Sequence, residues 1–235
     1  MKRELTYTEA QSQEMALSAL MSKVYLWMTM ALAITGLTAF YVSQNLNIVA
    51  AVFSSKLTIW GLVIAELAIV WGLSSRIMRM SFATAGILFG IYSILNGVLL
   101  SSIFLVYDMD VITQAFIASA CTFGAMSLVG TFVKRDLSAI GRFLFMALIG
   151  LIVATVINIF WTNNTLYWAI TYLGVLIFCG LTAYDTQKIR AIMLANSSPE
   201  NYEVGMKLAL LGSLTLYLDF VNLFLYLLRI FDSKK

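Results

Sequence analysis

Two acidic residues lie inside long apolar runs of the sequence, where a charged side chain is costly. Asp219 lies near the middle of the run 208–231, and Glu66 lies midway along the run 57–75. A carboxylate in a membrane span costs ~2.5–3.5 kcal/mol on insertion scales and usually faces protein or water. Carboxylates are also ligands that hard cations such as Ca²⁺ prefer. The two acids therefore indicate a cation pathway, since a purely structural role would be expensive.

Helical spacing places further polar side chains beside Asp219. Thr215, Asp219, Asn222 and Tyr226 recur at intervals of four, three and four residues, so they line one face of a helix. The other faces of this run are apolar and can meet lipid or neighbouring helices. We therefore predict an ion pathway formed by Glu66, Asp219 and Asn222.

The composition is that of a membrane protein. Of the 235 residues, 61% are hydrophobic and 11% are charged, whereas a soluble domain carries roughly 25% charge. Seven apolar runs have the length of a membrane-spanning helix, namely 24–42, 57–75, 82–106, 111–133, 141–161, 165–184 and 208–231. We predict an all-α membrane protein with seven transmembrane helices within 24–231, a cytoplasmic segment 1–23 and a short tail 232–235. Gly86 and Gly90 form a GxxxG pattern, at which two helices can approach closely.

Missing residue types exclude several functions. The chain has no histidine, which excludes Ser-His and Cys-His nucleophilic pairs, His-ligated zinc and histidine pH switches. Cys121 and Cys179 lie in apolar runs and are expected to be small buried residues. The sequence lacks a basic tract of the kind that nucleic-acid binding needs. We expect no enzyme activity, no resident cofactor and no nucleic-acid partner. The expected partners are the lipid bilayer and a permeant cation.

The distribution of lysine and arginine orients the chain. The N-terminal segment and the loops after the second, fourth and sixth runs carry most of these residues, which predicts a cytoplasmic N-terminus. Arg76 and Asp185 then end the second and sixth runs on the cytoplasmic side. A latch arginine bonded to a carboxylate would release when that carboxylate is protonated, which would make a cation path sensitive to pH. The alternative is structural: the polar residues hydrogen-bond across helices, and Arg76 and Asp185 are interfacial residues in water.

Three stretches resemble the Bax inhibitor-1 family, also called the transmembrane Bax inhibitor motif family. They are LYLDFVNLFLYLLRIF at 216–231, AYDTQKI at 183–189 and KRDLS at 134–138. The resemblance covers essentially the whole chain, and the first of these stretches is the most specific. It implies seven helices with the C-terminal helix at the centre, surrounded by the other six.

The resemblance also implies a function and its residues. It implies a pH-sensitive calcium leak in which Asp185 and Asp219 form a paired pH sensor. Glu66 matches an acid implicated in cation passage, so that Glu66, Asp185 and Asp219 would be the ligands of Ca²⁺. The family has a basic latch residue at the cytoplasmic end of the second helix. Arg76 is the expected latch, although Ile77 occupies the matching register.

The depths of the two aspartates conflict with the implied pairing. At ~1.5 Å of rise per residue, Asp185 lies roughly a third of the bilayer below Asp219. Pairing therefore requires that the sixth helix start deeper in the membrane or tilt.

Other functions remain open. Some bacterial members of the family are described as modulating a membrane-bound AAA protease, and eukaryotic members as suppressing cell death. The chain is alternatively such an interaction protein, without permeation, with the segment 1–23 as its contact. An intramembrane aspartyl protease is disfavoured because Leu216, Tyr217 and Leu218 precede Asp219 where those enzymes have GxGD. The compact loops favour the plasma (inner) membrane of a bacterium.

Overall fold

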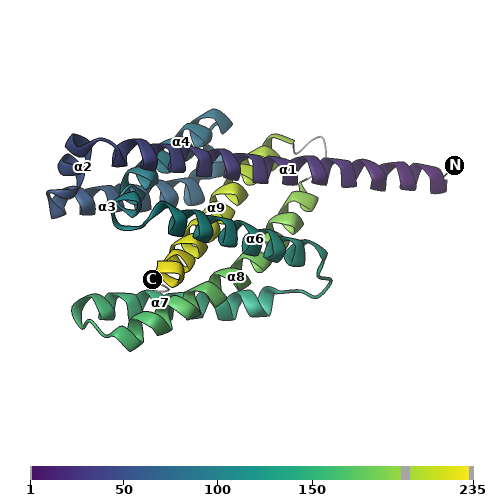
Figure 1. The fold of residues 1–235 in the computed structure, drawn as a ribbon. Coiled ribbons are helices and arrows are strands. Elements are labelled where there is room, and N and C mark those ends of the chain that lie inside the picture. The colour runs from purple at the N-terminus through teal and green to yellow at the C-terminus, as the bar shows by residue number, and fades with distance from the viewer. Residues whose placement is uncertain (1, 197–201, 233–235) are drawn as a thin grey trace. The chain divides into compact units, whose positions relative to one another are not determined.

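The structure is a computed structural model that describes residues 2–196 and 202–232 (Figure 1). Side chains are described in the ranges 11–196 and 203–232. Every regular element in these ranges is a helix, and seven of the helices are long and apolar enough to cross a membrane. The prediction of an all-α membrane protein with seven transmembrane helices is confirmed.

Most of the long helices match the predicted runs to within a few residues. The elements are α1 (Lys2–Ser43), α2 (Leu46–Phe53), α3 (Lys56–Arg76), the 3-10 turn η1 (Ile77–Arg79), α4 (Phe82–Leu100), α5 (Ile103–Val106), α6 (Met109–Phe132), α7 (Ser138–Phe160), α8 (Asn164–Ala195) and α9 (Tyr202–Asp232). The runs are predictable because the bilayer fixes the length of apolar helix that each span requires.

Two helices are much longer than their apolar runs. α1 begins at Lys2, although its run begins at residue 24, and α8 continues to Ala195, although its run ends at Tyr184. Neither extension contains proline or glycine, the two residues that most disfavour a helix interior. Hydropathy marks where an apolar run ends, whereas the helical hydrogen-bond pattern continues through polar residues.

The third predicted run is divided into α4 and α5. The hydroxyls of Ser101 and Ser102 donate hydrogen bonds to the carbonyls of Val98 and Leu99, at 2.7 and 3.0 Å. Such bonds from serine to a preceding carbonyl compete with the regular helical pattern and bend helices. In addition, the predicted connection 43–56 contains a short helix, α2, which its apolar composition favours.

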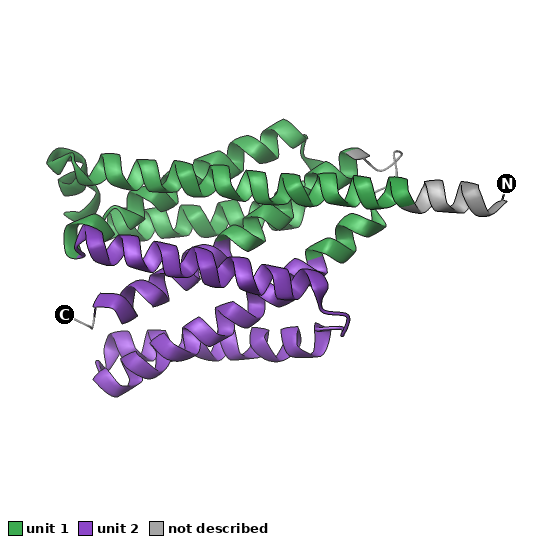
Figure 2. Cartoon of the chain, turned by 45° about the vertical axis from the view of Figure 1, so that its right-hand side comes forward, with its two compact units in different colours: residues 1–106, 189–217 green, residues 107–188, 218–235 purple. Residues whose placement is uncertain are grey.

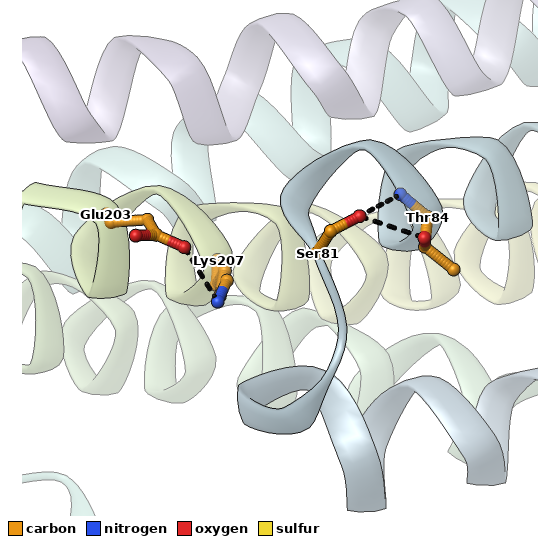
Figure 3. Close-up of polar contacts among 4 residues, drawn as sticks. All are labelled: Ser81, Thr84, Glu203 and Lys207. Carbon is orange, nitrogen blue, oxygen red and sulfur yellow. Dashed lines mark hydrogen bonds and ion pairs between the residues drawn. The ribbon is translucent and has the colours of Figure 1, made fainter.

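Local side-chain contacts stabilise the beginnings of α4 and α9 (Figure 3). The Ser81 hydroxyl accepts a hydrogen bond from the Thr84 N–H at 3.0 Å, which is the usual N-cap contact. In the first turns of α9, Lys207 Nζ lies 2.9 Å from Glu203 Oε1. A pair of opposite charges four residues apart stabilises a helix by ~0.2–0.5 kcal/mol.

The chain divides into two compact units, which Figure 2 distinguishes. Unit 1 comprises Met1–Val106 and Ile189–Tyr217, and unit 2 comprises Tyr107–Lys188 and Leu218–Lys235. Helices α8 and α9 therefore each contribute one part to each unit.

Within unit 1, α4 packs closely on α1 at Gly97. A Cβ atom at residue 97 would lie 2.6 Å from the Thr35 carbonyl oxygen and 2.7 Å from Thr38 Cβ. By contrast, a Cβ at Gly86 would lie 3.5 Å from Trp27, an ordinary contact, and one at Gly90 would have no neighbour within 4 Å. The close approach that the GxxxG pattern predicts therefore occurs at a different glycine of the same helix.

Of the seven spans, the C-terminal helix α9 has the largest fraction of buried residues. In its most apolar stretch 61% of the residues are buried, against 6% in the corresponding stretches of α3 and α7. The low values leave α3 and α7 with the apolar surface that lipid requires. The expectation that α9 is central and surrounded by six helices stays a prediction.

Candidate functional site

The candidate site is the acid pair, Asp185 of α8 and Asp219 of α9, both in unit 2. The Asp185 carboxylate acts electrostatically on that of Asp219, and their role as a paired pH sensor stays a prediction. The helix α8 is longer than the apolar run that predicted it. Its 32 residues correspond to about 48 Å, more than the ~30 Å of a hydrocarbon core. Asp185 lies within this helix and not at its end, and its depth relative to Asp219 stays a prediction.

Asp219 is the more enclosed member of the acid pair. Its side chain is 5% exposed, and its Oδ2 atom is buried without a hydrogen-bond partner in the described part of the chain. A buried carboxylate without a partner is costly, and a second carboxylate that acts on it couples the titration of the two. The geometry therefore makes Asp219 a place where a proton or a cation would bind.

A lysine that sequence reasoning missed lies beside the pair. Lys188, three residues after Asp185, interacts with its carboxylate electrostatically, and the Lys188 ammonium lies 5.8 Å from the centre of the Tyr184 ring. Residues three apart on a helix are neighbours, so the spacing in the AYDTQKI stretch was the available signal. Lys188 is thus one cation of unit 2 that lies within electrostatic reach of Asp185.

Two glycines let α6 and α7 pack against the segment 183–187 of α8. A Cβ at Gly130 of α6 would overlap the backbone carbonyl of Ala183, and the Ser127 and Thr186 hydroxyls lie 3.2 Å apart. A Cβ at Gly141 of α7 would overlap the Tyr184 ring. The residues on either side of Asp185 are therefore fixed by α6 and α7.

The last residue of this segment, Gln187, contacts the loop 133–137 between α6 and α7. Its Nε2 donates to the carbonyls of Val133 and Arg135 at 3.2 and 2.9 Å, and its Oε1 accepts from the Leu137 N–H at 2.9 Å. The KRDLS and AYDTQKI stretches are thus in direct contact, through a hydrogen bond between residues that are 50 positions apart in the sequence.

We expect one exposed carboxylate of this loop to make it sensitive to acid. Hydrogen bonds from the hydroxyl and N–H of Ser138 lower the pKa of Asp136 below its ordinary value. A lowered pKa means that the stabilisation is present above the pKa of the unfolded chain and is lost as pH falls through the folded value. In an NMR titration, the Ser138 amide should report a pKa below that of a free aspartate. Asp136→Asn should abolish this titration, and an Asp136 pKa at its ordinary value would contradict the expectation.

The other polar residues predicted around Asp219 make contacts within α9 or with α8. Asn222 Nδ2 donates to the Leu218 carbonyl at 2.8 Å, so its amide group is held to its own helix. Tyr226 stacks on Phe178 at 5.9 Å between ring centres. Neither contact tests the predicted role of Asn222 in an ion pathway, which stays a prediction.

Glu66 belongs to unit 1 and lies at the end of a chain of hydrogen bonds. Asn96 Nδ2 of α4 donates to Glu66 Oε2 at 3.5 Å, and the Tyr217 hydroxyl of α9 donates to Asn96 Oδ1 at 3.1 Å. Tyr217 also lies 2.7 Å from the Thr35 hydroxyl, which donates to the Ser93 carbonyl at 2.9 Å. Glu66 thus makes a hydrogen bond across helices, and its role in an ion pathway stays a prediction. The roles of Tyr217 and Thr35 were not predicted.

Glu66 also has an unused oxygen. Its Oε1 atom is buried without a hydrogen-bond partner among the described residues. Glu66 and the acid pair lie in different units. The described residues contain no group of three acidic, histidine or cysteine side chains that could hold a metal ion. A Ca²⁺ site formed by Glu66, Asp185 and Asp219 therefore stays a prediction.

The predicted latch, Arg76, is the exposed last residue of α3 in unit 1. Ile77, which occupies the register of the family's latch, is buried and lies beside Phe89 and Leu214 in an apolar region of unit 1. The position at which the family is expected to have a basic residue is thus occupied here by a buried apolar side chain. The latch role of Arg76 stays a prediction.

Comparisons with known proteins agree with the resemblance. The family model described as "Inhibitor of apoptosis-promoting Bax1" matches residues 17–235. The chain is 44% identical over 219 residues to the inner membrane protein YbhL of Escherichia coli, covering 93% of each chain. It is 42% identical to an uncharacterized protein of Deinococcus radiodurans, covering 91% of this chain and 90% of that one. It is 36% identical to one of Borreliella burgdorferi, covering 97% of each.

Proposed function

The chain belongs to the Bax inhibitor-1 family, and from this premise we propose that it is a passive cation leak, with Ca²⁺ as its ion, gated by protonation of Asp185 and Asp219. The observation that carries the proposal is the acid pair, in which Asp219 is enclosed, close to a second carboxylate and short of a hydrogen-bond partner. Catalysis is no part of this function. The expected location is the inner membrane of a bacterium, as the name of the Escherichia coli relative states for that protein.

The gating follows from the charge of the pair. While the pair is charged, it attracts cationic side chains, and Lys188 of unit 2 is one that acts on Asp185. Protonation removes that attraction, because a neutral carboxyl group no longer holds the cation. The cation is then released and the path opens, so that the leak increases as pH falls. Glu66, which has a buried free oxygen in unit 1, would bind the permeant ion by its negative charge.

Ion flux into proteoliposomes tests this function. We expect the Ca²⁺ leak of the wild type to rise as pH falls, and Asp185→Asn and Asp219→Asn to lose or shift that dependence because asparagine cannot titrate. Glu66→Gln should lower the leak at every pH by about tenfold, equivalent to about 1.4 kcal/mol. Asp110→Asn, at an exposed position of α6, is the matched control and should behave as the wild type. A folded wild type that conducts no cation at any pH would end the proposal.

A second function is favoured by the length of α1. Its 42 residues correspond to about 63 Å, about twice the ~30 Å of a hydrocarbon core, so the helix is longer than one crossing of the membrane requires. Such an extension would suit contact with a partner, for example a membrane-bound AAA protease or a component of a stress or cell-death response. Deleting residues 1–10 separates the two functions: a leak that survives the deletion leaves this end of α1 free for a partner.

A further inference from the structure

The amide group of Gln187 uses both of its N–H donors and its carbonyl oxygen in hydrogen bonds to the backbone of the loop 133–137. A glutamine amide offers two N–H donors and one carbonyl oxygen. Here Nε2 donates to the carbonyls of Val133 and Arg135, and Oε1 accepts from the Leu137 N–H. No other type of side chain offers two donors and an acceptor at this reach with the same shape and no charge. The loop therefore depends on this one residue for three of its backbone groups.

The segment 183–187 of α8, which ends at Gln187, also contains Asp185 of the acid pair. Gly130 and Gly141 set how closely α6 and α7 approach residues 183 and 184. Gln187, which follows Asp185 in the sequence, restrains the same segment of α8 through its hydrogen bonds to the loop. The loop 133–137 and the adjoining parts of α7 and α8 carry charged residues, namely Lys134, Arg135, Asp136, Arg142 and Lys188. A shift or rotation of α8 would therefore change both the separation of the aspartates and their access to water.

We propose that Gln187 is a positioning residue that ties the loop 133–137 to α8 and thereby keeps Asp185 against Asp219 in a state closed to water. Asp219 is 5% exposed in the structure, and the proposal takes this arrangement as the closed state. The proposal deepens the proposed function and rests on it only for the effect on flux. The hydrogen bonds of Gln187 are thus a restraint on the closed state that is separate from the charge of the pair.

Chemical labelling of Asp219 tests the proposal without any need for conduction. A water-soluble carbodiimide with an excess of amine converts accessible carboxyl groups into amides, which mass spectrometry locates. In Gln187→Met, which keeps the length of the side chain but removes its hydrogen bonds, we expect Asp219 to be labelled about tenfold faster than in the wild type. The exposed Asp110 serves as the internal reference. Hydrogen exchange of the Leu137 amide should accelerate in the same variant, since its acceptor is lost.

Gln114→Met is the matched control, because Gln114 is exposed on α6 of the same unit. It should leave both the labelling and the exchange unchanged. Gln187→Glu provides a second variant in case Gln187→Met does not fold. It keeps the shape and the acceptor for Leu137 but loses both donors, so Asp219 labelling should rise while the Leu137 amide stays protected. Wild-type labelling of Asp219 in both Gln187 variants would overturn the proposal.

Flux separates this proposal from the proposed function. At mildly alkaline pH, where the wild type is expected to be closed, Gln187→Met should leak about tenfold more, whereas a variant that is merely unstable would leak less at every pH. If the wild type conducts and the variant keeps the wild-type leak, the positioning role fails and the function stands. If the wild type does not conduct but Asp219 labelling rises in the variant, the function fails and the positioning role stands.

Discussion

Gly130→Ala is expected to lower the free energy of unfolding by about 3 kcal/mol, near the upper end of the usual range for overpacking. The added methyl group would overlap the backbone carbonyl of Ala183 and lie 3.0 Å from Thr186 Cβ. A backbone atom cannot rotate away as a flexible side chain can, so α6 and α8 must move apart. Since Asp185 lies between Ala183 and Thr186, the variant should also change the pH dependence of the leak.

Gly124→Ala, on the same helix, is the matched control. A Cβ at residue 124 would have no neighbour within 4 Å, and alanine is favoured over glycine within a helix by ~0.8–1.0 kcal/mol. We therefore expect this variant to be as stable as the wild type or slightly more so. Thermal unfolding of the two variants in detergent provides the comparison. If both melt at the same temperature, the close approach of α6 to α8 at Gly130 is wrong.

The glycines illustrate what could and could not be predicted from the sequence. The seven spans were predictable because each must supply a helix of fixed length and apolar composition. The GxxxG pattern at Gly86 and Gly90 indicated close packing, yet the close contacts occur at Gly97 and Gly130. A glycine pattern reports that two helices can approach there. Which helix faces it depends on tertiary packing, which one sequence does not reveal.

The candidate site was predictable to a different degree. Asp219 and Glu66 were identified because a carboxylate in an apolar run is costly in itself. The pairing of Asp185 with Asp219 came from the resemblance alone. The depth estimate argued against it because hydropathy places Asp185 at the end of an apolar run, whereas α8 continues to Ala195. The contacts of Gln187 and Tyr217 had no sequence signal, since glutamine and tyrosine are ordinary residues whose partners are determined by the fold.

Tyr217→Phe is expected to lower the free energy of unfolding by about 1–3 kcal/mol, the cost of leaving buried polar groups unsatisfied. The Tyr217 hydroxyl is buried between the Thr35 hydroxyl at 2.7 Å and Asn96 Oδ1 at 3.1 Å. Phenylalanine keeps the edge-to-face ring contacts with Phe89 and Tyr92, so the change isolates the hydroxyl. Asn96, which donates to Glu66, then loses the contact that fixes its orientation.

Two comparisons show whether the loss arises from this chain of hydrogen bonds. Tyr172→Phe makes the same chemical change on α8, at a side chain that is 55% exposed, and should alter stability by less than about 0.5 kcal/mol. A double-mutant cycle with Asn96→Leu should give a coupling energy of about 0.5–3 kcal/mol with Tyr217→Phe, as expected for residues in one network. If instead the two changes are additive, the Tyr217 hydroxyl does not hold Asn96, and the orientation of Glu66 must be set by other contacts of α3 and α4.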